Sequence, residues 1–256
     1  MDTLEVIYSE FLSHTNNCNL LTLVGLVTTI LCLITLIRVL VWTPFKLYFL
    51  AQVLPGVDLK KLGKWAVITG ATGGIGKGYC KVLAEKGMNI VLISRSSEKL
   101  AKVAEEIREA YGVVVRTLTA DFHSTDIYER IEEELRELDV GVLVNNVGTS
   151  NVTATFLKTT NILQTTTDIL HVNCVSMTNM CAIVLPQMLH KDKGVIINIS
   201  SIGRIGFLGA PVYSSSKSYV SKLSECLQRT YRNSGKHQNQ ENKKSFSFSI
   251  CIKFKV

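Results

Sequence analysis

The chain of 256 residues lacks CxxC pairs and internal repeats, and it has little net charge outside its C-terminal part. Its seven cysteines are scattered, which argues against a zinc site or a redox dithiol. We expect small, buried, apolar cysteines in a protein of a reducing compartment. From Arg229 onward, seven basic residues and one acid, Glu241, contribute +6 of the net charge of +7. The remainder is nearly neutral and offers no basic face for nucleic acid.

Lysine and arginine are also missing from the first 37 residues, where a signal peptide would carry a basic segment. Leu20–Ile37 contains no charged residue, and the apolar run continues past Arg38 to Trp42. This length is typical of a helix that spans the core of a bilayer. The sequence therefore predicts one transmembrane anchor over residues 20–41.

The charges on the two sides of this anchor differ in sign. Acidic residues precede it, and basic residues such as Arg38, Lys46 and Lys64 follow it. Because basic flanks stay on the cytosolic side of a membrane, we expect residues 1–19 to be a short lumenal segment. Residues 42–63 then form a juxtamembrane linker to a cytosolic domain.

Apolar runs and amphipathic helical patterns alternate through the rest of the chain. The runs predict strands at Trp65–Thr69, Asn89–Ser94, Val113–Thr119, Val140–Val144 and Gly194–Ser200. Helices are predicted at Gly74–Lys86, Glu98–Ala110, Thr125–Leu138, Ile162–His190 and in a last segment that ends near Arg232. This alternation predicts an α/β fold, a doubly wound parallel sheet of the Rossmann type over residues 64–232, preceded by the transmembrane helix.

A glycine-rich turn follows the first predicted strand of this domain and opens its first helix. Gly70, Gly74 and Gly76 stand in a TGxxxGxG arrangement, with Thr72 and Ile75 between them. Such a turn leaves no side chain in the way of a pyrophosphate and presents it with free N–H groups of a helix N-terminus. We therefore predict that these five residues bind a dinucleotide cofactor.

The end of the second predicted strand indicates which dinucleotide this is. An NAD site has an acid there, which holds the ribose hydroxyls. This chain has Arg95 instead, between Ser94 and Ser96. A guanidinium pairs with a 2′-phosphate, so NADP(H) is the predicted cofactor. The competing interpretation of Arg95 is an exposed charge at the end of a strand.

Four motifs occur in a fixed order along the domain. They are TGATGGIG at residues 69–76, NNVG at 145–148, NISS at 198–201 and YSSSK at 213–217. Together they resemble the short-chain dehydrogenase/reductase family, and the resemblance runs from about Lys64 to Tyr231. It implies an NADP-dependent enzyme whose catalytic residues lie in the last two motifs and in the helix before them.

Tyr213 and Lys217 are four residues apart and share one face of the last predicted helix. A ketone reductase needs a proton donor as well as a hydride donor, and the resemblance implies that Tyr213 is this general acid. A lysine ammonium one helical turn away favours the phenolate, which is the physical reason for the spacing. Lys217 is also expected to bind the ribose hydroxyls of the cofactor.

The resemblance implies roles for further polar residues. Asp121 matches the family's aspartate that hydrogen-bonds adenine, and Asn145 belongs to the motif that stiffens the sheet beside the cofactor. Asn173 matches the helix asparagine that holds a proton-relay water. Ser201 is expected to orient the substrate carbonyl, but its spacing to the catalytic tyrosine is one residue shorter than usual, so Ser200 is the alternative.

An apolar N-terminal span before this domain resembles one membrane-bound branch of the family. That branch contains very-long-chain 3-oxoacyl-CoA reductases, 17-beta-hydroxysteroid dehydrogenases and hydroxysteroid dehydrogenase-like proteins. The resemblance implies NADPH-dependent reduction of a ketone on a lipid-like substrate, either a 3-oxoacyl-CoA or a steroid. The expected location is the endoplasmic reticulum membrane, with the catalytic domain in the cytosol. A mitochondrial membrane and a homodimer are left open.

After Tyr231 the resemblance ends, and residues 233–256 form a divergent polar and basic tail. From Phe246 to Val256 apolar and polar side chains alternate, a period typical of a strand. We expect the last strands of the family fold to be missing or replaced here. Two alternative functions follow: a catalytically inactive, truncated form that binds cofactor, and a membrane-bound interaction protein.

Overall fold

The computed structural model describes residues 2–42, 58–150, 156–159, 161–206 and 209–231. The chain divides into two units, Met1–Val57 and Asp58–Val256, which are described separately below. Much of the predicted linker and all of the predicted tail over residues 233–256 lie outside the described residues.

The first unit contains one long helix, α1 (Asp2–Ile37), followed by a π-helical turn, η1 (Arg38–Trp42). Within it, Thr22–Leu40 is long and apolar enough to cross a membrane, and its side chains are exposed. The hydroxyls of Thr28 and Thr35 each donate to a carbonyl one turn earlier at 2.8 Å, which satisfies them inside the helix. The predicted apolar helix is present, and it begins at Asp2 because no proline or glycine interrupts the residues before the apolar run.

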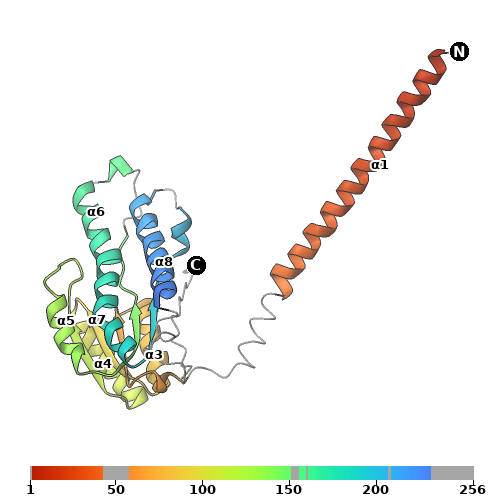
Figure 1. Ribbon diagram of the computed structural model, residues 1–256. Helices are drawn as coiled ribbons and strands as arrows, with labels where there is room; N and C mark the ends of the chain where they lie inside the picture. Colours follow the sequence, from red (N-terminus) through yellow and green to blue (C-terminus); the bar gives the residue numbers. More distant parts are fainter. Residues whose placement is uncertain (1, 43–57, 151–155, 160, 207–208, 232–256) are drawn as a thin grey trace. The chain divides into compact units, whose positions relative to one another are not determined.

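The second unit holds a five-stranded parallel sheet of order β3-β2-β1-β4-β5 (Figure 1). The described strands are β1 (Trp65–Thr69), β2 (Asn89–Ser94), β3 (Val115–Thr119), β4 (Val140–Asn145) and β5 (Val195–Asn198). The chain moves outward from β1 through β2 to β3, then returns to the other side of β1 for β4 and β5. This reversal is the mark of a doubly wound sheet, and it confirms the predicted fold class.

Helices cover both faces of this sheet. They are α3 (Gly74–Glu85), α4 (Ser97–Tyr111), α5 (Tyr128–Arg136), α7 (Ser176–His190) and α8 (Pro211–Tyr231). A further helix, α6 (Ile162–Leu170), packs against α8. Alternate strand residues point to opposite faces. Val67 therefore packs in the core that α5, α7 and α8 complete, whereas Ala66 and Ile68 pack in the core that α3 and α4 complete.

Shorter turns connect these elements. They are the 3-10 turns η2 (Leu59–Lys61), η3 (Phe156–Lys158) and η5 (Ile202–Ile205), and a π-helical turn, η4 (His171–Val175), that joins α6 to α7. The helical region predicted at Ile162–His190 is thus interrupted by a wider turn. This region is also long and apolar enough to count as a candidate membrane span, but 56% of its apolar 18-residue window is buried inside the domain, as expected of a core helix.

Gly76, in the first turn of α3, lies against the loop that precedes the helix. A Cβ atom at this position would stand 2.3 Å from the carbonyl oxygen of Gly70 and 2.6 Å from Nδ2 of Asn146. Neither atom is free to withdraw, because Asn146 Nδ2 donates a hydrogen bond of 3.1 Å to the same carbonyl. At Gly78, in the same helix, a Cβ atom would have no neighbour within 4 Å.

We predict opposite effects on stability for alanine at these two glycines. Gly78→Ala should raise the free energy of unfolding by up to about 1 kcal/mol, because alanine is the better helix former. Gly76→Ala should lower it by about 1–3 kcal/mol through overpacking of the turn. Urea unfolding of the full chain in detergent micelles measures both values. Equal effects of the two substitutions would contradict this account of the turn.

Candidate active site

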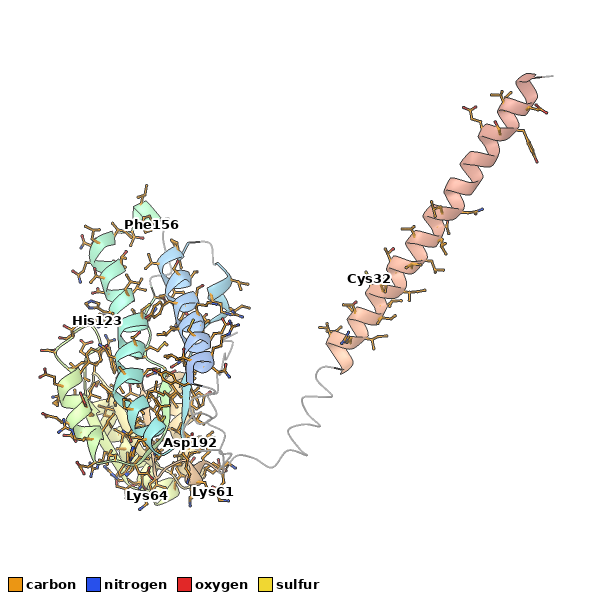
Figure 2. All side chains as sticks on the ribbon, in the orientation of Figure 1. Cys32, Lys61, Lys64, His123, Phe156 and Asp192 are labelled. Carbon is orange, nitrogen blue, oxygen red and sulfur yellow. The ribbon has the colours of Figure 1, made fainter. Side chains whose placement is uncertain are left out.

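The predicted site residues lie at the carboxyl ends of the strands. Figure 2 shows Lys61 and Lys64, which precede β1, at one end of the domain, and His123, which follows β3, displaced toward the other. In an open α/β sheet, ligands bind outside the carboxyl ends at the point where the strand order reverses. Here that point lies between β1 and β4.

The turn after β1 is held from both sides. The N–H of Gly70, at φ +63°, donates to the carbonyl of Ile93 at 2.8 Å. On the other side, Asn146, the residue after β4, donates from its Nδ2 to the carbonyls of Thr69 and Gly70 at 3.1 Å each. These hydrogen bonds fix the backbone on which a pyrophosphate would lie, and the side chain that does this is the second asparagine of the NNVG motif.

The helix that follows the turn presents the predicted anion site. Gly74, at φ +52°, begins α3, and the first N–H groups of the helix belong to Gly74, Ile75 and Gly76. Such N–H groups have no partner within their own helix and favour an anion. The hydroxyl of Thr72 lies 3.1 Å from that of Ser94, which ties the turn to the end of β2.

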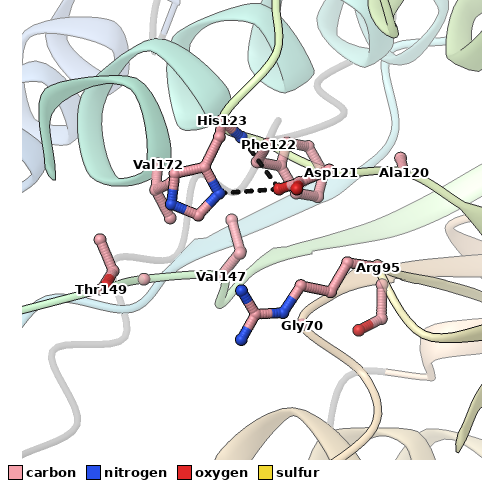
Figure 3. A pocket seen from close by; sticks show the side chains of 11 residues that line it. Gly70, Arg95, Ala120, Asp121, Phe122, His123, Val147, Thr149 and Val172 are labelled. Carbon is pink, nitrogen blue, oxygen red and sulfur yellow. Dashed lines mark hydrogen bonds and ion pairs between the residues drawn. The ribbon is translucent and has the colours of Figure 1, made fainter. Parts of the chain in front are cut away.

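A pocket of about 160 Å³ adjoins this turn (Figure 3). It is lined by Gly70, Ser94, Arg95, Ala120, Asp121, Phe122, His123, Val147, Gly148, Thr149 and Val172. The close-up shows the guanidinium of Arg95 pointing into this space beside Val147. Arg95 and Asp121, predicted from the sequence as cofactor-binding residues, therefore line one pocket together.

The carboxylate of Asp121 is held by His123. Oδ1 of Asp121 lies 2.8 Å from Nδ1 of the His123 ring and 3.2 Å from the His123 backbone nitrogen. The hydrogen bond from the ring holds the pKa of the Asp121 carboxyl below its usual range, and the charge of Arg95 acts in the same direction. The pocket thus presents an ionised acid opposite a cation.

Tyr213 and Lys217 lie together on α8, as their spacing predicts. The Lys217 ammonium is 5.8 Å from the centre of the Tyr213 ring and donates to the carbonyl of Ile199 at 3.2 Å. The side chain is buried, and this burial lowers the pKa of Lys217 to about 8. The ammonium form therefore still predominates at neutral pH.

Asn173 lies in the π turn η4 and is 2% exposed. Its Oδ1 accepts from the N–H of Thr149 at 2.8 Å, and its Nδ2 donates at 2.9 Å to the carbonyl of Thr149 and to the hydroxyl of Ser216. A Cβ atom on Gly148 would stand 3.2 Å from Lys217 Nζ and 3.4 Å from Asn173 Oδ1. The bare backbone of Gly148 thus lets the two predicted catalytic residues approach one loop.

The two candidate serines have different surroundings. Ser200 is buried, and its hydroxyl donates to the backbone carbonyl of Lys217 at 2.9 Å. Ser201 caps η5 by accepting from the N–H of Gly203 at 3.1 Å. A Cβ atom on Gly203 would stand 3.4 Å from Ser201 Oγ and 3.2 Å from Cε1 of Tyr213. Ser201 and Tyr213 therefore lie against the same glycine, whereas Ser200 is used to attach α8.

Asn145, the first asparagine of the NNVG motif, faces the interior and does not line the pocket. Its Nδ2 donates to Oδ1 of Asn198 at 2.9 Å, and Nδ2 of Asn198 donates to the hydroxyl of Ser224 at 2.8 Å. This row of buried polar contacts joins β4, β5 and α8. The sequence-based prediction that Asn145 contacts the cofactor stays a prediction.

Three residues of the site make contacts that the motifs do not predict. His123 binds the Asp121 carboxylate, His171 lies 3.1 Å through its Nδ1 from the carbonyl oxygen of His123, and Ser216 binds Asn173. The available clues were weak: His123 is two residues from the predicted adenine-binding acid, and Ser216 directly precedes the predicted catalytic lysine. The pairs His171–His123 and Asn173–Ser216 are 48 and 43 residues apart, so only the fold brings them together.

A doubly wound sheet with a glycine turn at its switch point is typical of dinucleotide-binding proteins, and here a Tyr–Lys pair lies nearby. The sequence identifies the family within this class. Residues 64–236 match the short chain dehydrogenase family, and the chain belongs to it.

Related proteins are similar over this domain. The very-long-chain 3-oxoacyl-CoA reductase of Rattus norvegicus is 44% identical over 179 residues, which cover 68% of this chain and 57% of that protein. The 17-beta-hydroxysteroid dehydrogenase type 3 of Rattus norvegicus is 40% identical over 215 residues, which cover 83% and 68%. The chain thus spans 57% of the length of the rat reductase that it matches.

Solved structures agree with the fold. A short-chain dehydrogenase from Sphingobium yanoikuyae in complex with NADPH is 28% identical, with a TM-score of 0.63 over 74% of this chain and 69% of that one. L-sorbose reductase from Gluconobacter frateurii, complexed with NADPH and L-sorbose, is 25% identical with a TM-score of 0.63 over 68% and 66%. The predicted cofactor is therefore one that these structural relatives bind.

We predict that the buried charge of Lys217 gives the stability a specific pH dependence. Its pKa is about 8 in the folded chain against 10.5 for an ordinary lysine, so between these values the unfolded state binds more protons and stability rises with pH. Relative to Lys217→Met, wild type should gain up to about 1.4 kcal/mol per pH unit above pH 8, and nothing below it.

Urea unfolding in detergent micelles at several pH values between neutrality and the alkaline range measures this difference. Lys222→Met is the matched control, because Lys222 lies on the same helix with its side chain 68% exposed. Parallel stability curves for wild type and Lys217→Met would contradict the burial of this charge.

Proposed function

We propose that this chain is an NADPH-dependent ketone reductase that acts on lipid-like substrates, with Tyr213 as the general acid. The observation that carries the proposal is the Tyr213–Lys217 pair, in which a buried ammonium lies 5.8 Å from the tyrosine ring. A cation at this position stabilises the phenolate that remains when the tyrosine gives up its proton. The membership in the short chain dehydrogenase family supports the same reaction class.

The residues around the glycine turn fit an NADP cofactor. A Cβ atom added at Gly73 or Gly74 would meet no protein atom within 4 Å, so the turn has room for a pyrophosphate there, and α3 offers its first N–H groups to it. Arg95 lines the pocket where a 2′-phosphate would need a cation, and Asp121 lines it where adenine would need an acceptor. When bound, NADPH supplies the hydride for the reduction.

The chain's own residues then handle the proton and the substrate oxygen. Tyr213 donates its hydroxyl proton to the carbonyl oxygen, and the Lys217 ammonium stabilises the phenolate. Ser201, which lies against the same glycine as the tyrosine ring, hydrogen-bonds the carbonyl oxygen and orients it. Asn173 ties the loop at Thr149 to α8, and in our proposal a relay water near it restores the proton.

Two observations support a lipid-like substrate. Relatives that are 40–44% identical over the domain are a very-long-chain 3-oxoacyl-CoA reductase and a 17-beta-hydroxysteroid dehydrogenase. In addition, η5, whose Gly203 touches Tyr213, exposes two apolar side chains, Ile202 at 51% and Ile205 at 77%. Apolar surface beside the proton donor suits an acyl chain or a steroid skeleton.

We also propose that α1 anchors the chain in the endoplasmic reticulum membrane, with the domain in the cytosol. Thr22–Leu40 has the length and composition of a span. The basic residues that follow it, against acids before it, favour this orientation. An anchored enzyme meets its substrate in the membrane plane, where lipid-like ketones are concentrated.

Tyr213→Phe should lower kcat about 10²–10⁴-fold, because only the proton donor is removed. The affinity for NADPH should stay unchanged. Reduction of a 3-oxoacyl-CoA and of a steroid ketone, followed through NADPH absorbance, measures turnover. Tyr219→Phe is the matched control on the same helix, since its hydroxyl contacts Thr178 at 2.8 Å, outside the proposed site. Retained turnover in Tyr213→Phe would refute the assignment, and NADPH binding without turnover by wild type would favour the inactive, cofactor-binding alternative.

Arg95→Asp should lower the affinity for NADPH about 10–100-fold relative to NADH, because it replaces the proposed phosphate ligand with a repelling charge. Lys99→Asp makes the same change of charge at an exposed position of α4 that does not line the pocket. Titration of both dinucleotides against intrinsic fluorescence measures the two affinities. An unchanged ratio in Arg95→Asp would remove this residue from the proposed site.

Protease added to intact microsomes should degrade the domain, and the protein should resist extraction by carbonate. Asn151-Val152-Thr153 is a glycosylation sequon that only a lumenal domain could use, so it should carry no glycan. Protease digestion after opening the vesicles with detergent is the control. A protected or glycosylated domain would reverse the proposed orientation.

A further inference from the structure

The carboxylate of Asp121 has one oxygen occupied within its own loop. Both hydrogen bonds described for this carboxylate end on Oδ1, one from the His123 ring at 2.8 Å and one from the His123 backbone N–H at 3.2 Å. The backbone of the loop is closed by a further hydrogen bond, from the N–H of Ser124 to the carbonyl of Asp121 at 3.0 Å. Within the described part of the chain no hydrogen bond to Oδ2 is found, so this oxygen is available to a ligand.

The chemistry of this contact fixes the tautomer of His123. An ionised carboxylate only accepts hydrogen bonds, so Nδ1 of His123 carries the proton and donates it. The Asp121 side chain is otherwise 56% exposed, and an exposed aspartate is free to change its rotamer. The ring of His123 removes this freedom, since a rotated carboxylate would lose a charge-assisted hydrogen bond.

His123 is itself held by a second histidine. Nδ1 of His171 lies 3.1 Å from the carbonyl oxygen of His123, and a carbonyl accepts, so His171 is the donor. His171 begins the π turn η4, which also carries Asn173. A continuous chain of contacts therefore runs from the acid in the pocket through two histidines to the turn that holds a proposed catalytic residue.

We propose that His123 is a positioning residue that aims Oδ2 of Asp121 at the exocyclic amino group of the cofactor's adenine, with His171 as its support. This rests on the proposed function, in which Asp121 accepts from adenine. Figure 3 shows His123, Asp121 and Val172 around one side of the pocket, opposite the guanidinium of Arg95. Adenine recognition in this chain thus uses a pair of residues, and the histidine determines how strictly the amino group is required.

The test compares NADPH with its hypoxanthine analogue, in which a carbonyl oxygen replaces the 6-amino group. Wild type, as the full chain in detergent micelles, should bind NADPH at least about tenfold more tightly, because the analogue sets an oxygen against a carboxylate. His123→Ala should reduce this ratio about three- to tenfold, the net value of one ordinary hydrogen bond, because the carboxylate is partly exposed. His123→Asn, whose side-chain amide also donates, should restore part of it.

Three further variants make the outcome decisive. Asp121→Asn should abolish the preference for NADPH over the analogue. His171→Ala should reduce this preference, but by less than His123→Ala does. His190→Ala, an exposed histidine at the end of α7, should leave it unchanged. Far-ultraviolet circular dichroism checks that each variant is folded.

The ratio of the affinities for NADPH and its analogue tests the role of His123 separately from the role of Asp121. If Asp121→Asn changes the preference and His123→Ala does not, the positioning role is overturned while the proposed cofactor site stands. A wild type that binds both dinucleotides equally would overturn the role of His123 and that of Asp121 together. Failure of wild type to bind NADPH at all would refute the proposed function itself.

Discussion

The attachment of α8 to the end of β5 is the constraint on which the candidate site depends. Tyr213 and Lys217 have the right spacing on any helix, but their place relative to the sheet is set by polar contacts along β5 and the residues after it. Asn198 reaches Ser224, Ser200 reaches the carbonyl of Lys217, and the lysine reaches back to Ile199. Directional contacts of this kind fix both the rotation and the height of a helix, which apolar packing alone leaves looser.

This attachment costs stability as well as providing it. The ammonium of Lys217 is buried with a lowered pKa, and Oδ1 of Asn145 is buried without a partner in the part of the chain that the structure describes. Buried polar groups of this sort are unfavourable unless fully paired. They lie near the carboxyl ends of the strands, where the structure also buries Thr69, Ser94 and Asn198. The candidate site is therefore the part of the domain that contributes least to the stability of the fold.

Sequence patterns were sufficient for the sheet and for the position of the glycine turn, because both depend on local chemistry. β1 and β2 begin and end where the apolar runs do, and Gly70 and Gly74 adopt positive φ. Sequence patterns were insufficient where the role of a residue depends on contacts with residues far away in the sequence. The choice between Ser200 and Ser201 depends on which hydroxyl attaches α8 and which lies beside Tyr213, and the proposed role of His123 depends on its rotamer. Neither the pattern of residues nor their spacing contains that information.

The π turn η4 inserts one residue into an otherwise regular helical run between α6 and α7. Each residue of an α-helix rotates the chain by about 100°, so the turn changes the phase of α6 relative to α7 by that amount. This places a constraint on evolution. A one-residue deletion in this turn would rotate α6 relative to α7, so that a different face of α6 would meet its neighbours. Only a compensating insertion nearby would restore the original contacts.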